Sequence, residues 1–162
     1  MGTSLSRSHR ILEHPLFLQE YDRLQRMEQG RVYCCHSLSH FLDVARVCWI
    51  GVLEQNLPLS KDVVYAAGLL HDIGKGLQYE FGTPHHEASC RLAQTILPEC
   101  GYSTEETQAI VQAIRLHRLP SSEGAPLVRL LYEADKKTRL CFCCAAGQDC
   151  NWPEEKKNHT IC

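Results

Sequence analysis

An adjacent histidine and aspartate, His71 and Asp72, follow the apolar run 66–70 and precede Gly74 and Lys75. Successive residues of a helix point about 100° apart, so within a helix these two side chains would not normally serve one centre. At a helix end the backbone can turn, and imidazole nitrogen plus carboxylate oxygen then form a mixed ligand set for Fe, Mn, Zn or Co. The dipeptide alone fits equally well a buried histidine beside a helix-terminal aspartate.

Three more polar residues lie on apolar faces of predicted helices. His40, His117 and Asp135 are each spaced three, four, seven or eight residues from apolar residues of their own segment, which places them on the core side. Burial of an ionised carboxylate is unfavourable unless it is paired or binds a metal. One core histidine is more often structural, but the same pattern on several helices favours a shared metal centre.

The elements that must position these residues are helices. Alternating strand patterns are scarce, and proline, glycine and serine punctuate six apolar-periodic segments. These predicted helices span approximately 15–29, 36–55, 61–71, 84–97, 104–117 and 126–136. We expect Ser60 to cap the third, a capping box at 103–106 to begin the fifth, and Gly74, Gly76 and Gly82 to mark a loop.

The composition fits one domain with a hydrophobic core. The 162 residues carry a formal charge of −2 and are 44% apolar, which indicates neither disorder nor nucleic-acid binding through bulk charge. No apolar run approaches the length of a membrane span, and the N-terminus lacks the apolar core of a signal peptide. We therefore expect a cytoplasmic protein; the sequence leaves its oligomeric state open.

The order His40, His71-Asp72, Asp135 resembles the HD-domain metal-dependent phosphohydrolase superfamily, over about residues 36–140. The segments 40–45, 71–75 and 134–136 resemble its first, second and last motifs, and the chain looks like a small bacterial stand-alone member. The resemblance implies an all-α HD-domain bundle around a metal site in residues 1–140, followed by a cysteine-rich tail, 141–162. It also selects His40 over His36, which lies four residues earlier on the same face.

The resemblance further implies two divalent ions, iron, manganese or similar, bridged by Asp72. In HD proteins with two or more metals, two extra histidines fall between the second and last motifs. His86 and His117 match these positions, with His85 as the alternative to His86. A one-metal site, with these histidines as substrate contacts, is the other interpretation.

Such a site implies a phosphohydrolase that cleaves a phosphoester or phosphoanhydride, most simply of a nucleotide. Bound cations lower the pKa of water enough to supply hydroxide at neutral pH, and they neutralise charge on the phosphate. Lys75 could meet a phosphate oxygen or assist the leaving group, and His36 could line the mouth of the site. The candidate phosphate-binding arginines are Arg31, Arg115, Arg118 and Arg139. We expect loops 76–85 and 118–125 to recognise the rest of the substrate.

Two other functions are compatible with the same residues. A few HD proteins are mixed-valent di-iron oxygenases, although nothing in this sequence demands O₂ chemistry. A non-catalytic module that binds a nucleotide or a partner is the third possibility. Nucleic-acid binding is poorly supported, because no basic patch with interleaved aromatic residues is present.

The tail holds several of the ten cysteines. Cys141, Cys144 and Cys150 have knuckle-like spacing, and Cys34 could supply a fourth thiolate to a zinc ion or an iron–sulfur cluster. Cys35 and Cys143 are alternative ligands. A tail of free thiols is the simpler interpretation. If the metal site forms, it would fasten the tail across the first two helices.

Overall fold

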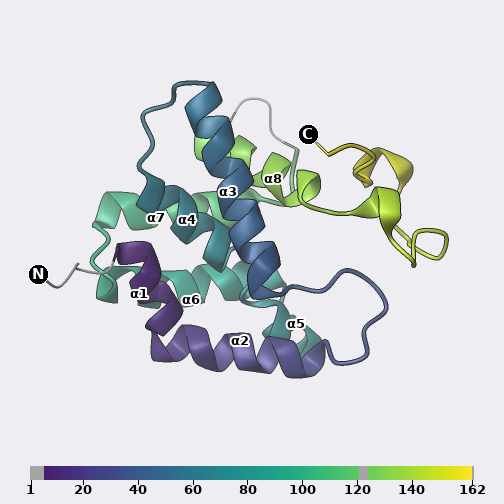
Figure 1. The fold of residues 1–162 in the computed structure, drawn as a ribbon. Coiled ribbons are helices and arrows are strands. Elements are labelled where there is room, and N and C mark those ends of the chain that lie inside the picture. The colour runs from purple at the N-terminus through teal and green to yellow at the C-terminus, as the bar shows by residue number, and fades with distance from the viewer. Residues whose placement is uncertain (1–5, 121–123, 162) are drawn as a thin grey trace, which may run out of the picture.

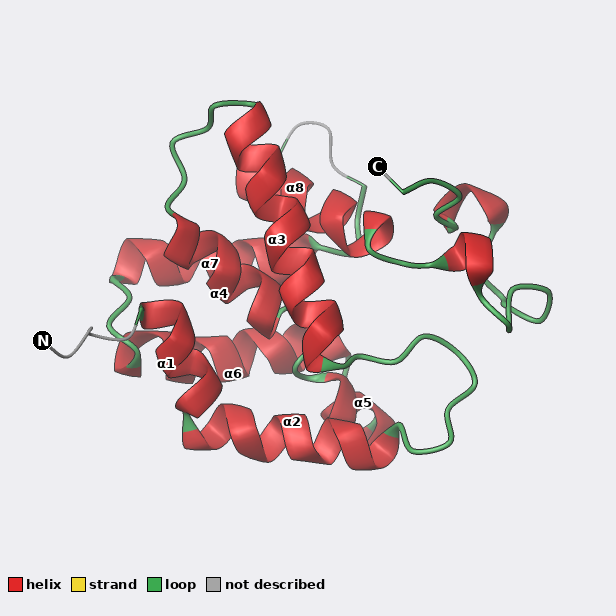
Figure 2. Cartoon of the chain, viewed as in Figure 1, coloured by secondary structure: helices red, strands yellow, loops and turns green. Residues whose placement is uncertain are grey.

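The computed structural model describes residues 6–120 and 124–161, and within these ranges the chain is helical with no strand (Figures 1 and 2). The eight α-helices are α1 (Arg7–Glu13), α2 (Pro15–Met27), α3 (Leu38–Glu54), α4 (Lys61–Leu70), α5 (Lys75–Phe81), α6 (His85–Glu99), α7 (Thr104–Leu116) and α8 (Pro126–Lys137). Two 3₁₀ turns, η1 (Cys141–Cys143) and η2 (Glu154–Lys156), follow in the tail. The predicted all-α class is confirmed. None of the described helices is both long and apolar enough to cross a membrane.

Serine caps set the start of three helices that carry site residues. The side chains of Ser37, Ser60 and Ser103 accept hydrogen bonds from backbone N–H groups in the first turns of α3, α4 and α7. Ser103 and Glu106 form the reciprocal capping box expected from their spacing. These caps fix where each helix begins, and therefore which side chains face inward one to four turns later.

The predicted loop around Gly74, Gly76 and Gly82 is instead the short helix α5. Gly74 is its N-cap, and Gly82 ends it in the left-handed region at φ +75°. Gly76 allows close packing on α2, because a Cβ there would lie 3.1 Å from the backbone nitrogen of Leu24. Most of the predicted substrate loop 76–85 is therefore helical. In the other predicted substrate loop, 118–125, residues 121–123 lie outside the described ranges.

Helices α3 and α4 form the centre of the bundle, with α7 and α8 packed against them (Figure 1). At their contact, a Cβ on Gly68 would lie 2.6 Å from the Cβ of Ala45 and 2.7 Å from its Cα. Glycine is therefore required for this approach of the two backbones. The close packing brings the imidazoles of His40 and His71 to a ring-centroid distance of 5.6 Å.

Helix α1, which the sequence did not predict, is fastened to the bundle by Arg7. Its guanidinium donates to both carboxylate oxygens of Glu106, at 2.6 and 3.0 Å, and its Nε lies 3.4 Å from Oδ2 of Asp62. The hydrogen bonds from Arg7 lower the pKa of Glu106. A lowered folded-state pKa stabilises the fold above the unfolded pKa, and this contribution is lost as the pH falls through the folded value.

We therefore expect Arg7→Met to lower the free energy of unfolding by about 1 kcal/mol at pH 7, after allowance for solvent screening of this partly exposed pair. Urea denaturation at pH 7 and at pH 3 measures the effect. The difference between the two proteins should shrink as the pH falls through the folded-state pKa of Glu106 and its carboxylate takes up a proton. An equal difference at both pH values would show that the charge of Arg7 is not what stabilises the docking of α1.

Candidate metal centre

His71 and Asp72 lie in the tight turn between α4 and α5. His71 is the C-cap of α4, and the turn 71–74 is almost wholly buried. The Oγ of Ser89 accepts a hydrogen bond of 2.9 Å from the N–H of Gly74, which fixes the turn against α6. A Cβ on Gly74 would lie 2.6 Å from the carbonyl oxygen of His85. The turn therefore aims both side chains inward and brings the start of α6 next to them.

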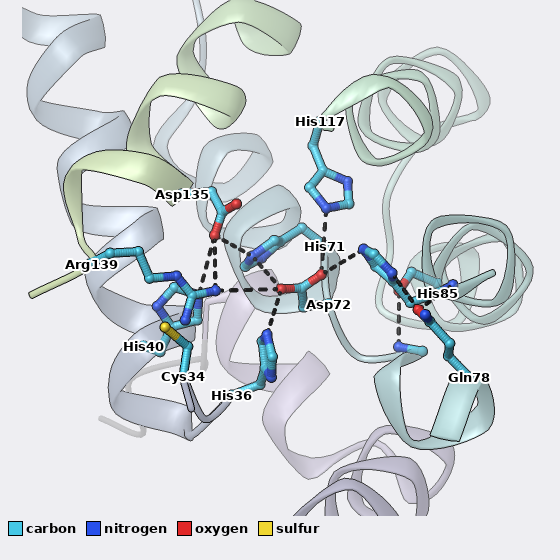
Figure 3. A network of polar contacts seen from close by, with 12 residues as sticks. Cys34, His36, His40, His71, Asp72, Gln78, His85, His117, Asp135 and Arg139 are labelled. Carbon is cyan, nitrogen blue, oxygen red and sulfur yellow. Dashed lines mark hydrogen bonds and ion pairs between the residues drawn. The ribbon is translucent and has the colours of Figure 1, made fainter. Parts of the chain in front are cut away.

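One group of four ligands collects on one side of Asp72 (Figure 3). The Nε2 of His71 lies 3.4 Å from Oδ2 of Asp72 and 3.6 Å from Oδ1 of Asp135. The Nε2 of His40 lies 3.4 Å from the same oxygen of Asp135. The four side chains come from α3, the end of α4 and α8, and all are buried.

A second group forms on the other oxygen of Asp72. Its Oδ1 lies 3.2 Å from Nε2 of His85 and 3.4 Å from Nε2 of His117. His85 is the first residue of α6 and His117 the C-cap of α7. Asp72 therefore belongs to both groups and presents a different oxygen to each (Figure 3).

Hydrogen bonds orient the imidazoles so that their Nε2 atoms face the carboxylates. The Nδ1 atoms of His71 and His117 donate to the carbonyl oxygens three residues earlier, at 2.7 and 2.5 Å. The Nδ1 of His85 donates to Oε1 of Gln78 at 2.6 Å. A histidine that donates from one ring nitrogen presents a lone pair on the other, which is the arrangement found in metal-binding histidines.

The protonation preferences fit a cation site. Burial lowers the pKa of His40 to about 4 and that of His85 to about 2, so both imidazoles are neutral at pH 7. Burial alone would raise the pKa values of Asp72 and Asp135, but the surrounding imidazoles outweigh it and hold both well below their usual range. Burial likewise opposes the charge on His71, yet the two carboxylates raise its pKa to about 9. The metal-free centre thus combines two buried carboxylates with the neutral imidazoles of His40 and His85 and a proton on His71, whose place a metal ion would take.

The unpaired atoms of the centre are also those that would bind an ion. Within the described part of the chain, Nε2 of His40, Nε2 of His71 and Oδ1 of Asp72 are buried without a hydrogen-bond partner. Ligand atoms that share one ion at about 2.0–2.2 Å lie roughly 3.0–3.6 Å apart, which matches the distances above. Buried polar atoms without partners are destabilising, and a divalent cation would satisfy them. The residues present therefore fit one or two such ions.

The structure reverses the expected order of His85 and His86. His85, the alternative in the sequence, is buried in the second group. His86 points to a separate cavity between α6 and α7, lined also by Cys90 and Arg115. Two adjacent residues at the start of a helix face different sides, so only one can reach Asp72. Arg115, a candidate phosphate ligand, is likewise remote from the centre.

His36 is buried and contacts the centre from the loop between α2 and α3. Its Nε2 lies 3.4 Å from Oδ2 of Asp72, and its Nδ1 lies 2.5 Å from Oε1 of Glu28. Glu28 also accepts from the backbone N–H of His36 and from the hydroxyl of Tyr79. His36 thus contacts Asp72, and its hydrogen bonds with Glu28 fix the orientation of the imidazole. No motif in the sequence pointed to Glu28 or to Gln78.

A cavity of about 380 Å³ opens in front of the centre. His36, Asp72, His85, His117 and Asp135 line its floor. Six cationic side chains line its walls: Arg31, Lys75, Arg118, Lys136, Arg139 and Lys156. The predicted substrate residues His36, Arg31, Arg118 and Arg139, and the predicted catalytic Lys75, are all among the lining residues. With only two carboxylates present, the cavity suits an anionic ligand.

Arg139 is the most buried of these cations. Its Nη2 lies 3.3 Å from Oδ1 of Asp135 and 4.0 Å from Oδ2 of Asp72. Lys136 reaches Oδ2 of Asp135 at 2.6 Å. Arg139 therefore approaches the same two oxygens that face His40 and His71, whereas Lys136 contacts the other oxygen of Asp135.

The four thiols predicted as a second metal site are not assembled. Cys150 lines the cavity in front of the centre, whereas Cys141 and Cys144 line a neighbouring one; Cys34 borders both. Among the described residues, the groups of three or more potential ligands within 4.8 Å of one another contain no cysteine. The alternatives Cys35 and Cys143 are exposed free thiols. The tail is held by other contacts, described below.

The fold and the site together define an all-helical protein with a buried histidine–carboxylate cluster built around an HD dipeptide. Residues 37–140 match the family model described as HD domain, which covers more than half of the chain. The chain belongs to the HD-domain family. Family membership and the buried His/Asp cluster together support a metal-dependent phosphohydrolase.

The chain is also similar to individual proteins, in sequence or in structure. It is 41% identical to an uncharacterised protein of Clostridium beijerinckii, over 97% of this chain and 99% of that protein. It is 32% identical to ribonuclease Y of Aquifex aeolicus over 64% of this chain, but spans only 17% of that protein. A crystal structure of a predicted HD superfamily hydrolase from an uncultured Thermotogales bacterium superposes with a TM-score of 0.62 over 92% of this chain and 86% of that chain, at 20% identity, and shows the shared fold.

Proposed function

We propose that this protein is a metal-dependent phosphohydrolase that cleaves a phosphoester or phosphoanhydride bond of a nucleotide. The observation that carries the proposal is Asp72, whose two oxygens face two separate sets of histidines. His40, His71, Asp72 and Asp135 would hold one divalent ion; Asp72, His85 and His117 would hold a second. Iron or manganese suits this mixed nitrogen and oxygen donor set.

Divalent ions held there would supply Lewis-acid activation of water and of the phosphate group. The chain's own residues have complementary tasks. Lys75 and Arg118 lie on the cavity wall, where they can bind phosphate oxygens and orient the scissile bond. Burial lowers the pKa of Lys75, while Asp72 and Asp135 favour its charged form. Lys75, in the first turn after the HD dipeptide, is the group best placed to neutralise a departing oxygen.

The charge of the cavity favours phosphate chemistry over the oxygenase alternative. Six cations against two carboxylates create a positive field in a partly enclosed space, which attracts and orients a polyanion. Ribonuclease Y, to which the chain is related, has a name that denotes action on RNA, whose bonds are phosphodiesters. That relationship supports hydrolysis at phosphorus for this chain as well.

The test is release of phosphate or nucleoside from a nucleotide panel, with Mn²⁺, Fe²⁺ or Co²⁺ added to metal-free protein. Elemental analysis of the same sample reports how many ions are bound and of which kind. We expect turnover that depends on the metal. Metal bound at the centre with no turnover across the panel would contradict the proposal, and tight nucleotide binding in that case would favour a non-catalytic module.

A further inference from the structure

We propose that the C-terminal segment 149–158 forms one wall of the substrate site, with Trp152 stacking on the base of the nucleotide and Lys156 binding its phosphate. This inference rests on the proposed function and adds the residues that select the substrate. In Figure 1 the tail leaves the end of α8 and lies on the same side of the molecule as the loop between α2 and α3. Cys150, Asn151, Trp152 and Lys156 of this segment line the cavity in front of the metal centre.

Contacts at both ends hold the segment in place. At its start, the hydroxyl of Tyr33 donates to the carbonyl oxygen of Asp149 at 3.4 Å. At its end, Nδ2 of Asn158 donates to the carbonyl oxygens of Lys137 and Arg139, at 2.9 and 2.8 Å. These are carbonyls left free where α8 ends, so Asn158 ties the tail to the element that carries Asp135. Four residues of the segment between these anchors line the cavity.

Trp152 is the aromatic surface of this wall. Its ring is only partly buried and is approached by two cations, Nζ of Lys136 at 5.4 Å and the guanidinium carbon of Arg139 at 6.0 Å. Both cations also contact Asp135. The indole is therefore fixed beside the metal centre by residues that belong to it. A flat ring at this place offers a stacking surface to a planar base.

Lys156 brings a cation from the tail to the same cavity. Residues that precede the tail already contribute three cations, Arg31, Lys75 and Arg118, to the wall of the cavity. Lys156 lies in η2, four residues after Trp152, so an aromatic surface and a positive charge arrive together. This pairing fits a ligand that has a base at one end and phosphates at the other, rather than a phosphorylated sugar or inorganic phosphate alone.

The test compares two probes that resist hydrolysis, measured by calorimetry on the full chain loaded with Mn²⁺. One is α,β-methylene-ADP; the other is methylenediphosphonate, which carries the same charged group without a nucleoside. We expect Trp152→Leu to weaken the nucleotide probe about tenfold and to leave methylenediphosphonate unchanged, while Trp152→Tyr keeps most of the affinity. We expect Lys156→Gln to weaken both probes about fivefold.

Lys137→Gln is the matched control, because Lys137 is exposed at the end of α8 and lines other cavities. It should leave both affinities unchanged. Equal weakening of the two probes by Trp152→Leu, no weakening of either, or failure of the unaltered protein to prefer the nucleotide probe would overturn the inference. Turnover of ADP by the unaltered protein reports on the proposed function separately, since hydrolysis can persist when the tail variants have no effect.

Discussion

Asp72→Asn should remove most of the metal bound by the protein and lower nucleotide turnover on the order of 1,000-fold. Asparagine keeps the size of the side chain but removes the charge and one of the two oxygens. Each oxygen of Asp72 faces a different set of histidines, so the change affects both groups at once. Elemental analysis after dialysis, together with steady-state kinetics at saturating Mn²⁺, measures both effects.

The matched control is Asp43→Asn on α3. Asp43 is exposed, pairs with Arg46 at 3.2 Å, and lies outside the cavity in front of the centre. It should change neither metal content nor turnover. If Asp72→Asn kept two bound ions, the bridging role assigned to Asp72 would be wrong, whatever its effect on activity. Thermal denaturation of the metal-free proteins confirms that the variant is folded.

The caps and periodic faces of the helices could be predicted from sequence because they depend on local chemistry. Ser60 and the capping box at Ser103 and Glu106 lie where their spacing predicts, and the inward positions of His40 and Asp135 follow from the helical repeat. Helix α5 was missed because glycine weakens helix propensity. Gly74 is its N-cap, Gly76 makes the close contact with α2, and Gly82 ends the helix in the left-handed conformation. The contact of Gly76 depends on tertiary packing, which a local sequence pattern does not show.

Residues that act through distant contacts carried no signal in the sequence. Glu28 and Gln78 orient His36 and His85, but each is an ordinary polar residue of a helix or a helix end. Trp152 lines the cavity in a tail that Tyr33 and Asn158 connect to the rest of the chain by long-range hydrogen bonds. The cysteine spacing of the tail suggested a metal knuckle, but the ligand groups among the described residues contain no cysteine, and hydrogen bonds connect the tail to the end of α8. Local sequence patterns could therefore not predict which residues distant in the sequence meet at the site.

The choice between His85 and His86 provides the second large expected effect. We expect His85→Ala to lose one of the two ions and to lower turnover about 100-fold or more, because the second group would keep only Asp72 and His117. The first group retains all four ligands, so one ion should remain bound. Elemental analysis distinguishes this partial loss from the general loss expected for Asp72→Asn.

His86→Ala is the control that the adjacent sequence offers. His86 lines a cavity on the other side of α6, away from Asp72, so two ions and near-normal turnover should remain. The opposite result, with His86→Ala losing an ion and His85→Ala keeping both, would mean that the start of α6 is rotated by about one residue in the metal-bound protein. Equal metal loss in both variants would indicate that the first turn of α6 is required as a unit, and that neither imidazole alone defines the second site.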